Sequence, residues 1–232
     1  MKKVILITGA SAGIGKDTAI LLAQAGNIVY GAARRLDKMK DLEGYGVKLL
    51  AMDVTDDDSM VKGVTEIIAA EKRIDVLVNN AGYGSYGAVE DVPLDEARYQ
   101  FEVNVFGLAR LTQLVLPHMR SQKSGKIINV SSMGGRFGEP HGAWYHATKF
   151  AVEGFSDSLR MELKQFGIDV VVVQPGAIKT EWGGIAGDNL LKTSGNTAYG
   201  KLARLHAKVL QNEDGKMGSE PIVIAKAIKK SC

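Results

Sequence analysis

Short apolar runs alternate with longer segments of helical periodicity along most of the chain. The apolar runs are rich in Val, Ile and Leu, and they are almost continuously hydrophobic. This pattern is typical of strands that are buried on both faces of a sheet. The sequence predicts strands at Val4–Thr8, Ile28–Ala32, Val47–Asp53, Ile74–Asn79, Lys126–Ser131 and Asp169–Gln174.

Helical patterns fill the gaps between these strands. Alternation of this kind implies right-handed crossovers and a parallel sheet with helices on both faces, which is a doubly wound α/β fold in three layers. Glycine and proline are taken as stop signals, and a threonine followed by an acid as a capping box. The expected helices are Gly13–Ala25 before Gly26, one starting at the Thr55–Asp58 box, Leu94–His118 ending near Pro117, and Trp144–Phe166 before Gly167.

The segment 183–220 differs from the rest because it is rich in Gly, Asn, Lys and Asp. One amphipathic helix is expected inside it, with Tyr199, Leu202, Leu205 and Val209 on its apolar face. Such segments are either mobile lids over a substrate or poorly ordered surface loops, and the composition leaves both open. No linker or repeat divides the chain, so residues 1–232 are expected to form a single domain.

Composition narrows the function classes. The net charge is +3 and the basic residues are scattered, so nucleic acid is not an expected partner. Cys232 is the only cysteine, which rules out a disulfide within one chain and favours a reducing compartment. The apolar run Val4–Ile7 is too short for a signal peptide, and no run is long enough for a membrane span. We expect a cytoplasmic protein, and the sequence suggests no metal site.

A glycine-rich turn, TGASAGIG at residues 8–15, joins the first strand to the first helix. Gly9, Gly13 and Gly15 let the backbone approach a phosphate closely, and the helix that follows offers free N–H groups and the positive end of its dipole. The spacing differs from G-x-G-x-x-G, and the turn lacks the Gly-Lys-Ser/Thr end of a P-loop. Its position between strand and helix favours a phosphate site over a purely structural turn.

If the phosphate site holds a dinucleotide, the residues that end the second strand indicate whether that dinucleotide is NAD or NADP. An acidic residue at this place would bind the ribose 2′-hydroxyl of NAD. The chain has Arg34 and Arg35 instead, whose guanidinium groups match the 2′-phosphate of NADP. We expect NADP(H) to be preferred over NAD(H), the alternative being two solvated arginines that start a surface helix. Asp53 and Asn79 end the next two strands at the same ligand-binding edge.

Tyr145 and Lys149 lie one helical turn apart on one face of a predicted helix. The ammonium favours the phenolate, so the pKa of Tyr145 is expected to fall below its usual value of about 10. Such a tyrosine can exchange a proton with an alcohol or a carbonyl. Ser132 follows the fifth strand and is either a cap or a hydrogen-bond donor to a substrate oxygen. Asn104 lies inside a predicted helix, an unfavourable place for asparagine, and indicates a buried hydrogen bond or a bound water.

Five motifs follow one another along the chain: TGASAGIG, NNAG at 79–82, Asn104, Ser132 with Tyr145-x-x-x-Lys149, and PGAIKT. Together they resemble the short-chain dehydrogenase/reductase family in its compact, single-domain form. The resemblance runs from Val4 to about Trp182 and implies a Rossmann-type fold, strand order 3-2-1-4-5-6-7 and a nicotinamide cofactor. The chain stops after EPIVIAKAIKKSC, where the family adds a seventh strand, so either the sequence is shortened or the sheet ends at six strands, and we expect six strands in this chain.

The resemblance also implies roles for individual residues. Tyr145 would be the general acid/base, Ser132 would position the substrate oxygen, Lys149 would lower the pKa of the tyrosine and hold the nicotinamide ribose, and Asn104 would support a water-linked proton relay. The implied cofactor-binding residues are Gly9, Ser11, Gly13, Ile14, Gly15, Arg34, Arg35, Asp53, Val54, Asn80, Ala81, Gly82, Tyr145, Lys149, Pro175, Gly176, Ile178 and Thr180.

The favoured function is an NADP-dependent oxidoreductase of a secondary alcohol or ketone, similar to the hydroxysteroid or retinol dehydrogenase branch and active as a homo-oligomer, a dimer or tetramer. Alternatives are an NAD-preferring dehydrogenase, a non-catalytic nicotinamide-binding regulatory module, and a lyase or epimerase. The intact Ser–Tyr–Lys set argues against the module, and the lack of a large C-terminal substrate domain argues against the lyase. Candidates for an apolar substrate pocket are Tyr83, Tyr86, His141, Trp144 and Trp182.

Overall fold

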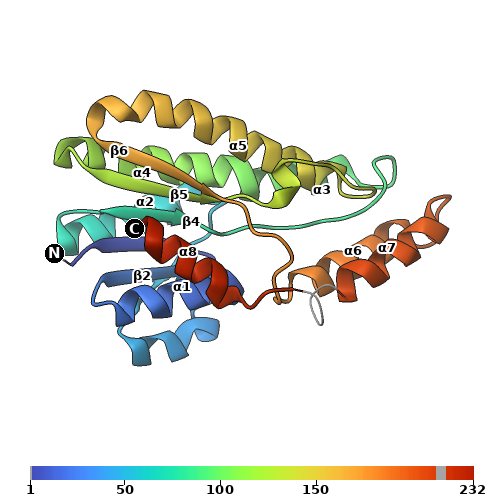
Figure 1. Cartoon of the computed structure of the whole chain (residues 1–232), viewed down its shortest axis with the longest axis horizontal. Helices are drawn as coiled ribbons and strands as arrows, with labels where there is room; N and C mark the ends of the chain where they lie inside the picture. Colours follow the sequence, from blue (N-terminus) through green and yellow to red (C-terminus); the bar gives the residue numbers. More distant parts are fainter. Residues whose placement is uncertain (1, 213–217) are drawn as a thin grey trace.

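Six parallel strands form one sheet in the order β3-β2-β1-β4-β5-β6 (Figure 1). The computed structural model describes residues 2–212 and 218–232. The predicted Rossmann-type sheet of six strands is therefore confirmed, with ends that differ by a few residues from those expected. The strands are β1 (Val4–Thr8), β2 (Ile28–Ala33), β3 (Lys48–Ala51), β4 (Val76–Asn79), β5 (Gly125–Val130) and β6 (Ile168–Val173).

Helices cover both faces of the sheet, which gives the three expected layers (Figure 1). One face carries α2 (Asp57–Glu71), α4 (Gly107–Gln122) and α5 (Ala143–Leu163), and α3 (Leu94–Phe101) leads into α4. The other face carries α1 (Gly13–Gln24), the 3-10 segment Leu36–Tyr45 and α8 (Pro221–Ser231). A hairpin of α6 (Trp182–Ser194) and α7 (Gly200–Asn212) lies beyond the carboxyl ends of the strands.

Alternate residues of each strand feed two separate hydrophobic clusters. Val4 and Leu6 of β1 pack toward α2, α4 and α5, whereas Ile5 and Ile7 pack toward α1 and α8. This is the period-two consequence of the extended backbone, and it explains why the runs are apolar throughout. Packing on both faces fixes the strand ends at the position between β1 and β4, where the order of the strands reverses.

The C-terminal segment forms α8 and not a further strand. Pro221 stands in its first turn, where a missing backbone N–H costs nothing. Ile228 is fully buried in the cluster that contains Leu22 of α1, so α8 packs beside α1 over the sheet. The apolar residues of EPIVIAKAIKKSC are thus used to cover a face of the sheet.

Two expected helix boundaries are wrong. Asp56, not Thr55, caps α2, because its carboxylate accepts the N–H of Ser59 at 3.2 Å while the Thr55 hydroxyl donates to Asp53. Pro117 does not end its helix, which runs on to Gln122. Buried Met119 anchors the last turn in the core, and this packing outweighs the hydrogen bond that the proline removes.

The segment 183–220 contains two long helices where one was expected. The apolar pattern at 199–209 lies in α7, and α6 was hidden by the glycine-rich composition before it. The mobility that the sequence suggested for this segment stays a prediction, and residues 213–217 of it lie outside the described residues. Within the described parts of the chain, no helix combines the length and the apolar character needed to cross a membrane.

Candidate active site

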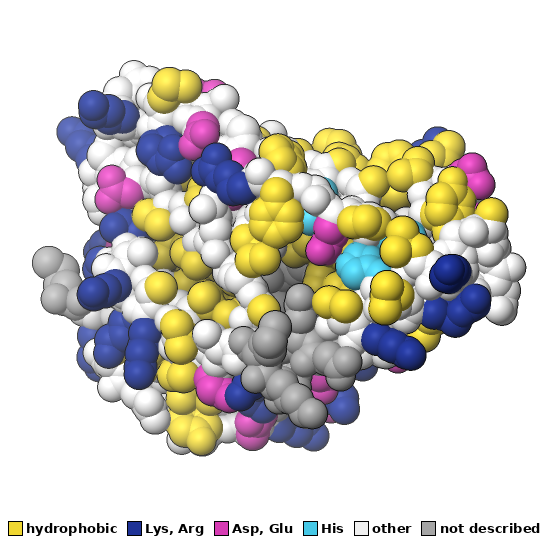
Figure 2. All heavy atoms as spheres, turned by 45° about the vertical axis from the view of Figure 1, so that its right-hand side comes forward, with side chains coloured by type: hydrophobic (Ala, Val, Ile, Leu, Met, Phe, Trp, Pro, Cys, Tyr) yellow, Lys and Arg dark blue, Asp and Glu magenta, His cyan; other side chains and the backbone are white. Residues whose placement is uncertain are grey.

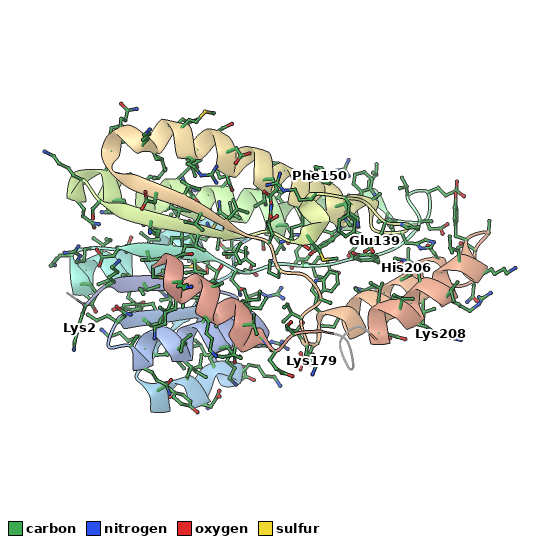
Figure 3. The ribbon with its side chains drawn as sticks, viewed as in Figure 1. Lys2, Glu139, Phe150, Lys179, His206 and Lys208 are labelled. Carbon is green, nitrogen blue, oxygen red and sulfur yellow. The ribbon has the colours of Figure 1, made fainter. Side chains whose placement is uncertain are left out.

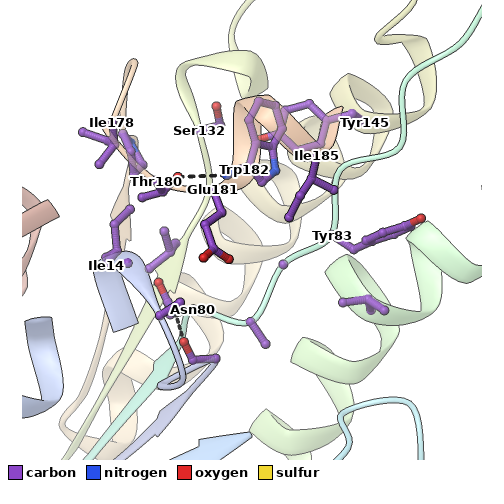
Figure 4. Close-up of a pocket in the computed structure, with 18 of the residues that line it drawn as sticks. Ile14, Asn80, Tyr83, Ser132, Tyr145, Ile178, Thr180, Glu181, Trp182 and Ile185 are labelled. Carbon is purple, nitrogen blue, oxygen red and sulfur yellow. Dashed lines mark hydrogen bonds between the residues drawn. The ribbon is translucent and has the colours of Figure 1, made fainter. Parts of the chain in front are cut away.

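A cavity of about 720 Å³ opens at the carboxyl ends of the strands, where the strand order reverses between β1 and β4 (Figure 4). Ligands of open α/β sheets bind at such a reversal. Nearly all the residues predicted to bind cofactor or substrate line it, and Gly15 and Asn104 lie just behind the lining. The lining members are Gly9, Ser11, Gly13, Ile14, Arg34, Arg35, Asp53, Val54, Asn80, Ala81, Gly82, Ser132, Tyr145, Lys149, Pro175, Gly176, Ile178 and Thr180.

Thr8 and Asn80 fix the glycine-rich turn against the end of β4. The Thr8 hydroxyl accepts the backbone N–H groups of Asn80 and Ala81 at 3.1 and 3.0 Å. In return, Nδ2 of Asn80 donates to the carbonyl oxygens of Thr8 at 3.0 Å and Gly9 at 3.2 Å (Figure 4). Hydrogen bonds between TGASAGIG and NNAG, two motifs far apart in the sequence, therefore hold this part of the cavity lining in place before any ligand binds.

The turn has the shape that a phosphate site requires. A Cβ on Gly15 would lie 2.3 Å from the carbonyl oxygen of Gly9, so only glycine fits there. Gly9 and Gly13 have φ values of +67° and +52°, which other residues adopt with strain. Ala12 gives the start of α1 no side-chain cap, and its first turn carries no acidic residue. The N-terminus of α1 can therefore offer its N–H groups and its positive dipole to an anion.

The opposite end of the cavity carries the two arginines that follow β2. Arg34 donates from Nη1 to the Tyr99 hydroxyl at 3.0 Å, and Arg35 also borders the cavity. Asp53 lies two residues beyond the end of β3, and it accepts the N–H and the hydroxyl of Thr55 at 3.0 and 2.8 Å. This end is thus cationic and open, which suits a phosphate group, and the residues of the whole cavity fit an extended dinucleotide.

Ser132, Tyr145 and Lys149 come together in the middle of the cavity. Tyr145 and Lys149 share one face of α5, and the Ser132 side chain is near enough to the Tyr145 hydroxyl to lower its pKa. The Ser132 hydroxyl also accepts the N–H of Gly134 at 3.0 Å, so it caps the next turn as well. The Lys149 ammonium donates to the Val130 carbonyl at 3.1 Å and lies 5.7 Å from the centre of the Tyr145 ring.

The expected fall in the pKa of Tyr145 is wrong for this structure. Burial raises the pKa of Tyr145 to about 12, against a smaller lowering by the hydrogen bond from Ser132. Burial also lowers the pKa of Lys149 to about 8, which Glu153 only partly offsets. Spacing on the helix brings the two groups together, but the cost of removing charges from water exceeds their attraction. At neutral pH the phenol is therefore protonated.

Asn104 lies in a π-helical segment, Glu102–Phe106, between α3 and α4. Its side chain accepts the N–H of Tyr83 at 2.7 Å and donates to the Tyr83 carbonyl at 2.8 Å and to the Thr148 hydroxyl at 3.0 Å. This explains why asparagine occurs inside a helical region. It ties the loop after β4 to α5 one residue from Lys149, and the expected proton relay stays a prediction.

The sequence predicted only part of the lining at the end of the cavity beyond Tyr145, where the aromatic side chains lie and a substrate is expected. Tyr83, Tyr86 and Trp182 line it, and the rings of Tyr145 and Trp182 lie 5.1 Å apart (Figure 4). Two candidates are wrong: His141 contacts His206, and Trp144 borders a separate hollow near α3. Helical spacing could not show which face of its helix Trp144 occupies. Lining residues that sequence reasoning missed include Met133, Phe137, Glu139, His146, Ile185 and Leu210.

The α6–α7 hairpin is docked against the body beside this end of the cavity. Ser194 accepts the N–H of Ala88 at 2.9 Å, and the Nδ1 atoms of His141 and His206 are 3.2 Å apart. Leu190 and Ala207 of the hairpin share a buried cluster with Tyr145. Figure 2 shows the side of the molecule that carries this hairpin, and on it hydrophobic side chains surround histidine and acidic side chains.

A sequence model of the short-chain dehydrogenases matches residues 3–188, from the first strand into α6. The chain belongs to the short-chain dehydrogenase family. It is thus an oxidoreductase of a family that binds a nicotinamide cofactor. The predicted family is confirmed, whereas its hydroxysteroid or retinol dehydrogenase branch stays a prediction.

Three known proteins illustrate the similarity. The chain is 41% identical to a 3-ketodihydrosphingosine reductase of Bacteroides thetaiotaomicron, over 98% of this chain and 82% of that protein. It is 38% identical to an NADPH-dependent 3-dehydrocapnine reductase of Ornithobacterium rhinotracheale, over 85% and 72%. The crystal structure of a short-chain dehydrogenase from Streptomyces avermitilis superposes with a TM-score of 0.86 at 35% identity, over 99% and 83% of the two chains.

Substituting Gly15→Ala should weaken dinucleotide binding at least tenfold, because the added methyl group cannot fit beside the Gly9 carbonyl and must displace the turn. Titration of the reduced cofactor by fluorescence measures the effect. Gly44→Ala is the matched control, since Gly44 is exposed in the 3-10 segment Leu36–Tyr45 with open space around it, and alanine there should leave the affinity unchanged. Equal dinucleotide affinities in the two variants would contradict the assignment of the glycine-rich turn as a phosphate-binding site.

Proposed function

We propose that this protein is an NADPH-dependent reductase that converts a ketone into a secondary alcohol. The observation that carries the proposal is the meeting of Ser132, Tyr145 and Lys149 in a cavity that also contains a glycine turn and two arginines. The curated relatives described above are named as reductases, which favours this direction of reaction. The domain is proposed to be a single nicotinamide-binding unit over residues 1–232.

The chain's own residues would hold the cofactor along the cavity. The glycine turn at residues 8–15 would receive the pyrophosphate, and Asp53 with Val54 would face the adenine. Arg34 and Arg35 would bind the 2′-phosphate through charge-assisted hydrogen bonds, which is the basis for preferring NADPH over NADH. When bound, the reduced nicotinamide supplies the hydride that the carbonyl carbon accepts.

Tyr145 would act as the general acid. Its raised pKa keeps the phenol protonated at neutral pH, so it can give a proton to the substrate oxygen as negative charge develops there. Ser132 lines the cavity beside Tyr145 and would bind the same oxygen, stabilising that charge. The proton from the phenol and the hydride at carbon together complete the alcohol, and solvent returns a proton to the tyrosine.

Lys149 and Asn104 would position this machinery. The Lys149 ammonium is anchored on the Val130 carbonyl and would hold the nicotinamide ribose. The backbone of Gly82 passes close to both groups, since a Cβ there would lie at contact distance from Oδ1 of Asn104 (3.7 Å) and Nζ of Lys149 (3.9 Å). The α6–α7 hairpin, within the segment 183–220, would form a lid over the apolar end of the cavity.

Substituting Tyr145→Phe should reduce turnover by about 100- to 10,000-fold, the range of general acid catalysis, while leaving cofactor affinity nearly unchanged. Reduced-nicotinamide absorbance with a panel of ketones measures turnover, and Tyr45→Phe, at an exposed position, is the control. Turnover retained in the phenylalanine variant would contradict the role of Tyr145 as the proton donor.

Wild-type ketone reduction should hold through neutral pH, where the Tyr145 phenol stays protonated, and should decline first above about pH 8, where Lys149 loses the charge that would hold the nicotinamide ribose. A pH profile of turnover measures this, and a rate that stays constant up to about pH 10 would contradict the role of the Lys149 charge.

Substituting Arg34→Ala or Arg35→Ala should weaken NADPH binding about tenfold or more, and NADH binding far less, since a hydrogen bond to a charged group contributes about 1.5–3 kcal/mol. Titrations with both cofactors give the ratio of dissociation constants. Arg120→Ala, in an exposed position of α4 away from the cavity, serves as the control. Equal losses for the two cofactors would show that neither arginine distinguishes them.

A homo-oligomer is proposed through the outer surface of α3, α4 and α5. Leu94, Phe106 and Phe150 are at least half exposed there, and such large apolar side chains usually mark a contact surface. An apolar hollow of about 200 Å³ lies among Leu94, Phe101, Phe106 and Trp144 and could receive a side chain from a second copy. A dimer formed in this way leaves the cavity and the α6–α7 hairpin accessible.

Substituting Phe106→Lys should weaken self-association at least tenfold, because a charge would replace the apolar contact. Sedimentation equilibrium measures the molar mass as a function of concentration. Val61→Lys on α2, another exposed apolar position, should leave the assembly unchanged. A wild-type protein that stays monomeric at high concentration would disprove the oligomer.

A further inference from the structure

Glu139 is a carboxylate at the substrate end of the cavity for which the proposed reaction gives no use. It lines the same cavity as Tyr145, and its side chain is one-third exposed. Its closest donor is the Tyr86 hydroxyl, 2.8 Å from Oε1. In Figure 3, Glu139 lies beside His206 of α7, whose Nε2 is 3.8 Å from Oε2.

The neighbouring His146 does not cancel this charge in the arrangement observed. Its Nδ1 lies 2.8 Å from the Gly134 carbonyl and must donate, because a carbonyl oxygen only accepts. Its Nε2 accepts the backbone N–H of Glu139 at 3.2 Å, so it carries no proton. The ring is neutral in this hydrogen-bond arrangement. Burial opposes protonation of His146, but Glu139, whose Oε1 is only 3.5 Å from Nε2, outweighs it and raises the pKa of the ring.

His141 and His206, which meet where the α6–α7 hairpin contacts the body, do not both carry a positive charge. The Nδ1 atoms of His141 and His206 are 3.2 Å apart, and a hydrogen bond between them requires one ring to be unprotonated at that atom. Burial, followed by the proximity of His206, also lowers the pKa of His141, which favours its neutral form. Contacts with His146 and His206, together with the Tyr86 hydroxyl, hold the pKa of Glu139 well below its usual range, so the carboxylate stays ionised. It also keeps spare capacity to accept hydrogen bonds, since a carboxylate offers about four acceptor sites.

The surroundings of this carboxylate favour a cation over a neutral donor. The ring of Tyr86 lies 5.7 Å from both Tyr145 and Trp182, which places a cluster of aromatic rings beside Glu139. Aromatic faces attract ammonium groups, and a charge in weakly polar surroundings interacts strongly with an opposite charge. Apolar side chains also line the cavity, and they include Phe137, Ile185 and Leu210.

We propose that Glu139 binds an ammonium group of the substrate, so that the enzyme acts on amino ketones that carry an apolar chain. This inference rests on the proposed ketone reduction. Tyr86 donates to Glu139 and its ring packs on that of Tyr145, so the ammonium is held within a few bonds of the carbonyl that Tyr145 protonates. The apolar chain then lies against Phe137, Ile185 and Leu210, under the α6–α7 hairpin.

The test compares three ketones with the same long alkyl chain: an α-amino ketone, the α-hydroxy ketone and the unsubstituted ketone. Glu139→Gln should lower kcat/KM for the amino ketone by about 10- to 100-fold, because a charged hydrogen bond is lost, and should change the other two less than about threefold. A similar loss for the hydroxy ketone would mean that Glu139 binds a neutral donor, and equal losses for all three would assign it a structural role. Either result overturns the proposal.

Glu181→Gln is the matched control, because Glu181 also lines the cavity but extends from the loop before α6 toward Asn80 on the cofactor side (Figure 4). It should change the three substrates by the same factor, and a selective loss of the amino ketone there would assign the ammonium to Glu181 and overturn the proposal for Glu139. Glu139→Asp, which keeps the charge but withdraws it, should give an intermediate selectivity and replaces the glutamine variant if that does not fold.

A binding measurement separates this inference from the proposed function. Calorimetry on the enzyme saturated with NADP should show that Glu139→Gln binds a long-chain amino alcohol at least tenfold more weakly than the wild type, with unchanged affinity for the matching plain alcohol. Unchanged affinity for the amino alcohol contradicts the ammonium site even if ketones are reduced. If no ketone is reduced by the wild type, the proposed reaction itself fails, and selective amine binding would still support Glu139.

Discussion

The removal of Tyr145 and Lys149 from water governs the chemistry of the cavity. A phenolate and an ammonium are both costly to bury. Burial therefore raises the pKa of Tyr145, which keeps the phenol protonated, and lowers the pKa of Lys149. The hydrogen bond from Lys149 to the Val130 carbonyl compensates part of that cost. Packing around α5, and not the spacing of two residues along it, therefore decides which proton the site has available.

The sequence was sufficient to predict the sheet and the meeting of Ser132, Tyr145 and Lys149 at the ends of its strands. Runs such as Val4–Thr8 are apolar because both faces of the strand are buried, and this signal needs no knowledge of the tertiary structure. The protonation of Tyr145 was not predictable, since it depends on burial that only the folded chain reveals. Glu139 was missed because it lies in an irregular loop, where no periodicity indicates which side chains face a cavity.

The α6–α7 hairpin shows why composition alone misled. Glycines near the start of α6 suggested a loop, yet in the structure one of them, Gly187, permits close packing of α6 against α7. A Cβ on Gly187 would lie 2.7 Å from the Gln211 side chain and 3.1 Å from the Ala207 carbonyl. Small residues thus serve the contact between two helices, and a glycine-rich stretch in such a place is compatible with ordered structure.

The turn at residues 8–15 presents main-chain groups, and these are the same whichever dinucleotide a cell supplies. In the proposed function, the discrimination between NADPH and NADH comes from Arg34 and Arg35 after β2, which are exposed and take no part in the fold of the turn. On that proposal, replacing one or two surface residues would change which of the two cofactors the protein uses. Evolution can therefore adjust the source of reducing power while proton transfer at the far end of the cavity stays intact.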